Sequence, residues 1–187
     1  MRYLNLALIV LYLLISNQVC AIGLDSLIPK KHFELSFGQS LLFLSNSKQA
    51  NIRSQQALVI PTNAVLFFAE LRPDKTLRIP IFLNIPTESK QFLVNGVLAN
   101  EKASPTLGTG VSFKVFSVKI DDKSMVDFEG GPLVSVIFDS KNNIRMAPII
   151  GSRFKLTRGE NFVMYFGVSY SLGINALGIL YGTGTNF

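Results

Sequence analysis

The last twelve residues, 176–187, alternate between two kinds of side chain. With the two-residue period of a β-strand, one face is mainly apolar and ends in an aromatic: Leu177, Ile179, Tyr181, Thr183, Thr185 and Phe187. The other face is mainly small: Ala176, Gly178, Leu180, Gly182, Gly184 and Asn186. This pattern suits the closing strand of a small membrane β-barrel, in which outward residues meet lipid and a narrow lumen accepts only small side chains.

Seven earlier segments also read as extended, and most of them have ten or more residues. Strands of soluble sheets usually have about five or six residues, whereas tilted membrane strands need about 9–11. Pro61 removes a ladder donor inside the second segment, which predicts an irregularity there. We therefore predict an all-β fold, an eight-stranded antiparallel up-and-down transmembrane β-barrel over residues 32–187. The expected strands are 32–45, 56–71, 76–85, 105–120, 124–139, 144–157, 161–172 and 176–187, with 86–104 left unassigned.

The lengths of the predicted connections alternate along the chain. Short turns at 72–75, 121–123 and 158–160 would lie at one end of the barrel. The two longest loops, 46–54 and 86–104, would lie at the other end. Outer-membrane barrels have short periplasmic turns and longer external loops, so we expect the short turns in the periplasm.

The N-terminus reads as a targeting segment. Arg2 is followed by the apolar stretch Leu4–Ile15 and by small residues around Ala21, which predicts a signal peptide over 1–21 and a linker over 22–31. An uncleaved anchor helix and lipidation of Cys20 are the alternatives. The apolar stretch is short for a membrane span, and the residue before a lipidated cysteine is normally smaller than Val19.

Composition limits the chemistry that the chain can support. It has 187 residues with one cysteine and one histidine, so we expect no intramolecular disulfide, no metal site and no cofactor. The formal charge of +6 is spread without a Lys/Arg run, which favours contact with outer-membrane lipid headgroups and excludes a nucleic-acid partner. The only histidine, His32, begins the first strand and no G-x-S-x-G motif is present. We therefore predict no catalytic residues and no enzymatic activity.

The signal peptide, the repeated strand pattern and the terminal L-Y-G-T-G-T-N-F resemble the small OmpA/OmpX-type outer-membrane β-barrels of Gram-negative bacteria. Leu77–Asn84 is also similar to a strand of PorT-like Bacteroidetes barrels. The resemblance implies location in the outer membrane and assembly by the barrel-assembly machinery, with Tyr181 and Phe187 as the assembly signal. The chain departs from the pattern by lacking tryptophan and by having prolines within strands, at Pro61, Pro80, Pro132 and Pro148.

Charged residues on the inward faces need partners, because side chains fill the lumen of an eight-stranded barrel. If the fifth and sixth strands pair through 140–143, Glu129 lies near Arg153 or Lys155. We predict an interior salt-bridge network that closes the lumen. Its members are Glu34, Arg78, Lys114, Asp127, Glu129, Arg145, Arg153 and Lys155.

The loop 86–104 is the candidate for contact with an external partner, since binding residues often lie on long loops of a rigid scaffold. Its candidate residues are Glu88, Lys90, Phe92, Asn100 and Lys102. The sequence thus predicts an outer-membrane barrel with a structural or surface-interaction role. One alternative is a secreted or periplasmic soluble barrel or sandwich that binds a ligand or partner, with its apolar faces turned inward. Another is a lipid-modifying outer-membrane enzyme.

Overall fold

The computed structural model describes residues 31–44, 58–94, 97–138, 144–172 and 176–187. The predicted signal peptide, most of the predicted linker and the predicted loop 46–54 lie outside the described residues. No helix in the described part of the chain is long and apolar enough to cross a membrane.

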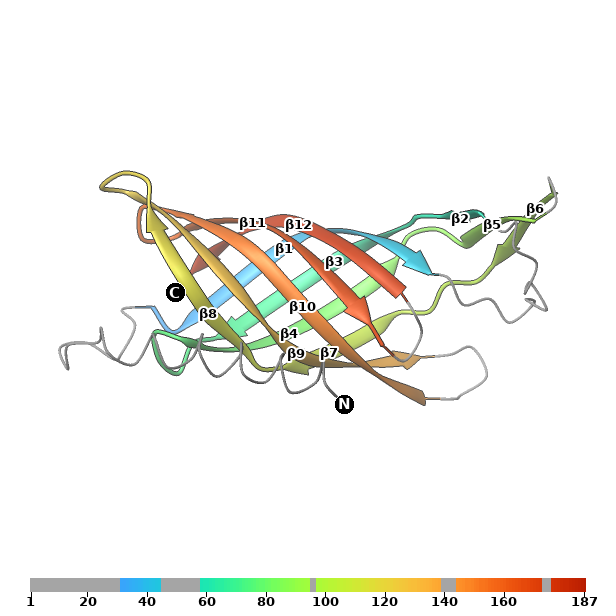
Figure 1. Cartoon of the computed structure of the whole chain (residues 1–187), viewed down its shortest axis with the longest axis horizontal. Helices are drawn as coiled ribbons and strands as arrows, with labels where there is room; N and C mark the ends of the chain where they lie inside the picture. Colours follow the sequence, from blue (N-terminus) through green and yellow to red (C-terminus); the bar gives the residue numbers. More distant parts are fainter. Residues whose placement is uncertain (1–30, 45–57, 95–96, 139–143, 173–175) are drawn as a thin grey trace, which may run out of the picture.

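Antiparallel strands close into an eight-stranded barrel, as the sequence predicts (Figure 1). Neighbours in sequence pair with one another around the barrel, and β12 pairs with β1 to close it, for example Glu34 with Asn186. β7 and β8 both pair with β4 and β9, so they are two halves of one barrel strand. The barrel strands are β1 (Phe33–Leu44), β3 (Thr62–Leu71), β4 (Leu77–Pro86), β7 (Thr106–Gly110), β8 (Ser112–Lys119), β9 (Ser124–Phe138), β10 (Ile144–Arg158), β11 (Phe162–Ser171) and β12 (Ala176–Asn186).

A second, three-stranded sheet extends past one end of the barrel (Figure 1). It consists of β2 (Leu58–Ile60), β5 (Lys90–Val94) and β6 (Val97–Glu101). Pro61 separates β2 from β3, which confirms the predicted irregularity. The unassigned segment 86–104 therefore contains a hairpin, β5 and β6, that pairs with β2 outside the barrel wall.

Three prolines in the interior of barrel strands, Pro80, Pro132 and Pro148, accept hydrogen bonds at their carbonyl groups. Pro80 accepts a hydrogen bond from the Thr109 hydroxyl at 2.9 Å. Pro132 accepts one from the Val111 amide at 3.1 Å, at the break between β7 and β8. The Pro148 carbonyl accepts from the Leu172 amide at 2.9 Å. Each proline costs the ladder one donor but leaves its acceptor satisfied.

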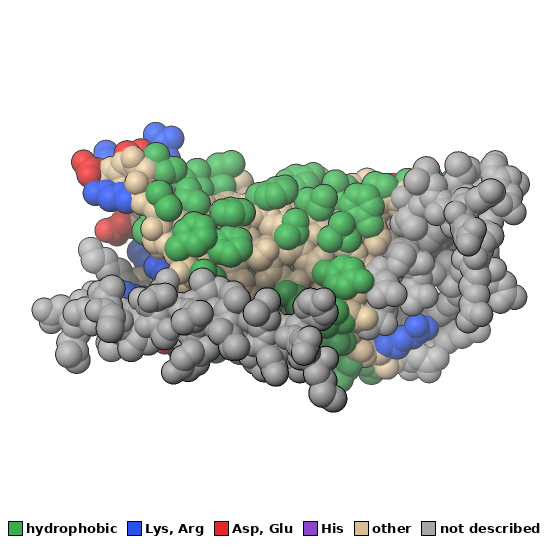
Figure 2. All heavy atoms as spheres, viewed as in Figure 1, with side chains coloured by type: hydrophobic (Ala, Val, Ile, Leu, Met, Phe, Trp, Pro, Cys, Tyr) green, Lys and Arg blue, Asp and Glu red, His purple; other side chains and the backbone are tan. Residues whose placement is uncertain are grey.

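Apolar faces point away from the lumen along the whole barrel. The Phe37 and Phe166 side chains are 55% and 52% exposed, whereas the Glu34 and Ser36 side chains beside Phe37 on β1 are buried. Figure 2 shows hydrophobic side chains over the visible wall, with charged side chains toward the two ends of the barrel. The alternative of a soluble barrel with inward apolar faces is therefore wrong, because it predicts the opposite polarity.

The small face of β12 provides space for an aromatic ring. Gly38 and Gly182 lie opposite each other on β1 and β12. A Cβ atom at these positions would lie 2.7 Å and 2.5 Å from the Tyr165 hydroxyl oxygen. Glycine at this pair therefore lets the β11 tyrosine enter the lumen.

The three predicted short turns, 72–75, 121–123 and 158–160, connect β3 to β4, β8 to β9 and β10 to β11. Gly159 has a φ of 64°, the left-handed conformation that favours glycine. We call this end of the barrel the short-turn end, and the opposite end, which carries β2, β5 and β6, the hairpin end.

Candidate functional site

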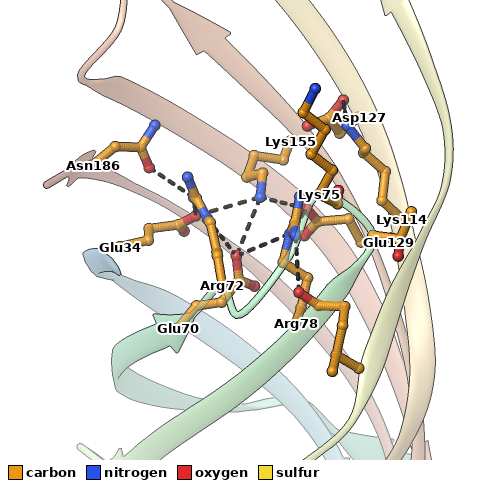
Figure 3. A network of polar contacts seen from close by, with 12 residues as sticks. Glu34, Glu70, Arg72, Lys75, Arg78, Lys114, Asp127, Glu129, Lys155 and Asn186 are labelled. Atoms are coloured by element: carbon orange, nitrogen blue, oxygen red, sulfur yellow. Dashed lines mark hydrogen bonds and ion pairs between the residues drawn. The ribbon is translucent and has the colours of Figure 1, made fainter. Parts of the chain in front are cut away.

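The short-turn half of the lumen is filled by three glutamates and four bases (Figure 3). All seven side chains are buried, and Lys155 is only 1% exposed. We call this group the lumen network: Glu34, Glu70, Arg72, Arg78, Glu129, Arg153 and Lys155. Such charges are tolerated in a barrel interior only when they are paired and hydrogen-bonded.

Arg153 on β10 contacts all three glutamates. Its Nε donates to Glu129 at 2.7 Å, its Nη1 donates to Glu34 at 3.1 Å, and its Nη2 donates to Glu70. Its guanidinium also lies 4.5 Å from the centroid of the Phe68 ring. This side chain therefore links β1, β3, β9 and β10 through one planar group that can donate five hydrogen bonds.

Lys155 is two residues along the same inward face and contacts the same glutamates. Its Nζ donates to Glu129, lies 3.3 Å from Glu70 and lies 3.5 Å from Glu34. Each glutamate thus has more than one cationic partner.

Arg72, in the turn after β3, and Arg78, near the start of β4, complete the network. Arg72 donates to Glu34, to Glu70 at 3.0 Å and to the Asn186 amide oxygen at 2.7 Å. Arg78 donates to Glu129 at 3.2 Å. These contacts connect side chains of β1, β3, β4, β9 and β10 across the short-turn half of the lumen.

The turn itself holds Arg78 in place. Arg78 donates to the backbone carbonyls of Asp74, Lys75 and Leu77, each at 2.9 Å. The Asp74 carboxylate accepts from the backbone amides of Thr76 and Leu77 at 2.6 Å. The pKa of Asp74 is lowered below its usual value, and the hydrogen bond from the Leu77 amide is the main cause.

The structure brings together five of the eight side chains that the sequence assigned to the interior network: Glu34, Arg78, Glu129, Arg153 and Lys155. Lys114 and Asp127 form a separate pair beside it, with Nζ and Oδ1 3.9 Å apart. Arg153 lies directly opposite Glu129 in the β9–β10 register.

Arg145 does not belong to the network, so the prediction was wrong for this residue. Its side chain is exposed at the hairpin end of β10. It shares the inward parity of Arg153 but lies eight residues, about 26 Å, away along the strand. Alternation therefore predicted the face correctly but could not predict the depth within the lumen.

Sequence reasoning missed Glu70 and Arg72. Both continue the inward face of β3, which includes the buried residues Leu66 and Phe68. The apolar inward residues made this strand look poorly two-faced, and Arg72 was assigned to the turn. Extending the two-residue period from Phe68 would have found both charges.

The hairpin-end half of the lumen is different. Here a cavity of about 110 Å³ is lined by serines and apolar side chains, among them Ser40, Leu66, Phe82 and Ser171. Ser40 donates to Asn84 at 2.8 Å, but the buried hydroxyls of Thr62 and Ser171 have no hydrogen-bond partner. No ion pair is found among the described residues that line this cavity.

The proposed contact residues of 86–104 are divided between an anchor and the outer hairpin. Glu88 accepts from both the backbone and side-chain amides of Asn63 at 2.7 Å, and so fixes the base of the hairpin to β3. Lys90 and Phe92 lie in β5, and the Phe92 side chain is outside the described part of the structure. Asn100 and Lys102 are exposed on or next to β6.

The two residues of the predicted assembly signal lie on the outside of the barrel wall. Tyr181 donates from its hydroxyl to the Gln39 side chain at 2.7 Å. Phe187 is 59% exposed, and its backbone amide donates to the Phe33 carbonyl at 2.8 Å. Both aromatic rings are therefore accessible from the membrane side.

His32 is exposed at the short-turn end, where its carbonyl accepts from the Arg72 amide at 2.8 Å. Among the described residues, no group of three or more His, Cys, Asp or Glu side chains could hold a metal ion.

No protein-family model matches the chain, and no curated protein matches it. Among solved structures, the chain resembles the outer membrane protein OprG from Pseudomonas aeruginosa, with a TM-score of 0.51 and 13% identity over 84% of this chain and 96% of that one. It also matches the N-terminal β-barrel domain of Pseudomonas aeruginosa OprF, with a TM-score of 0.48 and 10% identity over 84% and 98% of the two chains. Ail of Yersinia pestis matches with a TM-score of 0.41 and 9% identity over 84% and 97%. The fold is that of the small eight-stranded outer-membrane β-barrels.

Proposed function

We propose that this chain is an integral outer-membrane protein with a structural or surface-interaction role and no catalytic activity. The observation that carries the proposal is the inverted polarity of the barrel, with large apolar side chains outside and paired charges inside. Exposed apolar surface on this scale is costly in water and is satisfied by lipid. The basic excess of the chain fits contact with anionic headgroups.

The short-turn end faces the periplasm and the hairpin end faces outward in this proposal. The support is the asymmetry of the connections: three short turns lie at one end, and an extra three-stranded sheet extends from the other. Tyr181, on the lipid-facing side of β12, and Phe187, directly after β12, serve as the signal read by the barrel-assembly machinery.

The lumen is a closed plug rather than a path. Seven buried side chains with mutual ion pairs occupy its short-turn half. A lipid-modifying enzyme needs a nucleophile and a base within hydrogen-bond reach, and the single histidine, His32, is exposed at the rim. Function is therefore assigned to the outer surface.

The outer hairpin, β5 and β6, is the surface that meets an external partner. The Glu88 hydrogen bonds to Asn63 fix its base, while Lys90, Asn100 and Lys102 lie beyond it. Asn100 and Lys102 are exposed, and exposed polar residues beyond an anchored base are a common arrangement for binding loops.

Cell fractionation with heat-modifiable gel mobility tests the proposal. We expect the chain in the detergent-resistant envelope fraction, with an unboiled form that migrates differently from the boiled form. As a control, a variant without Phe187 should reach the periplasm but assemble poorly. Release of the unmodified chain by osmotic shock would contradict membrane insertion.

A further inference from the structure

The lumen opens at its short-turn end into a cavity of about 360 Å³. The described residues that line this cavity include two acids, Asp127 and Glu160, and a larger number of bases. The lining bases are Lys31, Arg72, Lys75, Arg78, Lys114 and Lys155. We call this space the basic mouth.

The lumen network does not cancel the charge of the basic mouth. Within the network, four bases face three glutamates, so one positive charge remains. Lys114 and Asp127 balance each other, and Lys31 and Lys75 outnumber Glu160. The described residues of the mouth and network thus carry seven bases against five acids. A recess in which one sign of charge is in excess attracts ions of the opposite sign.

Three of the bases lie on separate segments around the opening. Lys31 precedes β1, Lys75 is in the turn between β3 and β4, and Lys114 is in β8. In Figure 3, Lys75 and Lys114 lie beside the network, on the same side as Asp127. Ammonium groups from several directions around a cavity can surround an anion with many acceptor oxygens.

The carboxylate that pairs with Lys114 also accepts a hydrogen bond from another side chain. Its Nζ is 3.9 Å from Asp127 Oδ1, which is longer than a charge-assisted hydrogen bond of about 2.7–2.9 Å. The same Asp127 oxygen accepts a hydrogen bond from the Ser117 hydroxyl. An incoming anion would therefore offer Lys114 a shorter contact than the protein does.

We propose that the basic mouth binds a small anion with several phosphate oxygens, either a free polyphosphate or the phosphate of a lipid headgroup. This site goes beyond the proposed surface role, because it lies at the opposite end of the barrel from β5 and β6. The network bases Arg72, Arg78 and Lys155 form the floor of the site, and the three rim lysines provide the contacts to the anion.

Calorimetric titration tests the site with inorganic pyrophosphate as the probe. The full chain, folded in maltoside micelles at low salt, should bind pyrophosphate with an affinity that falls steeply as salt is added. The double variant Lys75→Gln and Lys114→Gln should bind at least tenfold more weakly. Absence of binding by the unmodified protein would overturn the proposal.

The matched control is the double variant Lys119→Gln and Lys123→Gln. It removes the same charge from the same end of the barrel, but both lysines are exposed and outside the lining of the mouth. Its affinity should stay within twofold of the unmodified protein, and equal weakening in both variants would contradict a defined site. Heat-modifiable mobility shows that each variant keeps its barrel. Lys31→Gln, before the first strand, should weaken pyrophosphate binding about threefold. This single variant replaces the Lys75→Gln and Lys114→Gln double variant if the double variant does not fold.

A second titration identifies the source of the phosphate. Glycerophosphoglycerol is the soluble headgroup of phosphatidylglycerol and carries one phosphate diester. If glycerophosphoglycerol binds more tightly than pyrophosphate, and its binding depends on Lys75 and Lys114 in the same way, the site is assigned to a lipid headgroup. If glycerophosphoglycerol binds more weakly than pyrophosphate and depends on the same two lysines, the site is assigned to a free polyphosphate. If both probes bind but neither depends on Lys75 and Lys114, the proposed site is overturned.

Discussion

At the short-turn end of the lumen, three glutamates and four bases fill the space between strands, whereas toward the hairpin end serines and apolar side chains surround a cavity of about 110 Å³. Both halves of the lumen are enclosed by the same eight strands, and the outer surface of these strands is apolar around both. The difference therefore comes from a few inward residues, such as Glu70 and Leu66, four positions apart on one face of β3.

This comparison indicates that the two halves are held together by different forces. In the charged half, every glutamate has several cationic partners, so the loss of one glutamate leaves the buried bases in larger excess. In the other half, hydroxyl groups such as that of Ser171 lack a protein partner and lie beside open space. Substitutions there should matter much less.

The largest effect is expected from Glu129→Gln, which leaves four buried bases facing two glutamates. Arg78, Arg153 and Lys155 would each lose a charged acceptor. We expect a loss of about 3–5 kcal/mol in the free energy of unfolding, measured by urea titration in lipid vesicles with the heat-modifiable form as readout. The control is Lys119→Gln, whose ion pair with Asp122 is exposed and should contribute about 0–1 kcal/mol. Equal losses would show that the network does not stabilise the barrel.

Arg153→Met should cost less than Glu129→Gln, although Arg153 makes more contacts. Its removal leaves three bases facing three glutamates, so the remaining charges balance. The cost is the loss of its hydrogen bonds and of its contact with Phe68, about 2–3 kcal/mol. The same urea titration measures it. A larger loss than in Glu129→Gln would mean that geometry, rather than net charge, dominates the network.

A single type of substitution compares the two halves directly. The Ser36 hydroxyl donates to Glu34 at 2.9 Å in the charged half, so Ser36→Ala should cost about 1–2 kcal/mol. Ser171→Ala, at an equally buried position beside the hairpin-end cavity, should change stability by less than about 0.5 kcal/mol, because no protein hydrogen bond is lost. If the two variants unfold at the same urea concentration, the halves do not differ in the way proposed.

The sequence was sufficient to predict the barrel, because strand faces follow from a two-residue period that does not depend on distant contacts. All eight strands were located to within a few residues, and the inward positions of Glu34, Glu129 and Lys155 followed from parity alone. The break at Val111 was not predicted, since it depends on where β7 and β8 meet Pro132 on the neighbouring strand.

The composition of the network was harder to predict than its existence. Parity gives the face of a strand, but the position along the barrel axis depends on the stagger between strands. Arg145 was therefore included although it lies at the opposite end from Arg153. Glu70 was missed because the inward face of its strand begins in the apolar half of the lumen and ends in the charged half.

A smaller loss than for Glu129→Gln, Arg153→Met or Ser36→Ala is expected at Asp74, in the turn that supports the charged half. Its carboxylate accepts from the backbone amides of Thr76 and Leu77, and Arg78 donates to carbonyls of the same turn. These hydrogen bonds hold the pKa of Asp74 below its usual value, with the Leu77 amide as the main cause. A lowered pKa in the folded state stabilises the protein at pH values above the unfolded pKa, and this contribution is lost as the pH falls through the folded pKa.

Asp74→Ala should therefore cost about 0.5–1 kcal/mol at pH 7, and the difference from the unmodified protein should shrink as the pH is lowered below 4. Urea titrations at the two pH values measure both parts of this prediction. Asp122→Ala, in the turn between β8 and β9, is the control, because that carboxylate is exposed and pairs only with the exposed Lys119 among the ion pairs of the described residues. If the cost of Asp74→Ala does not change with pH, the aspartate supports the turn through its shape rather than its charge. The turn would then position Arg78 independently of the protonation of Asp74.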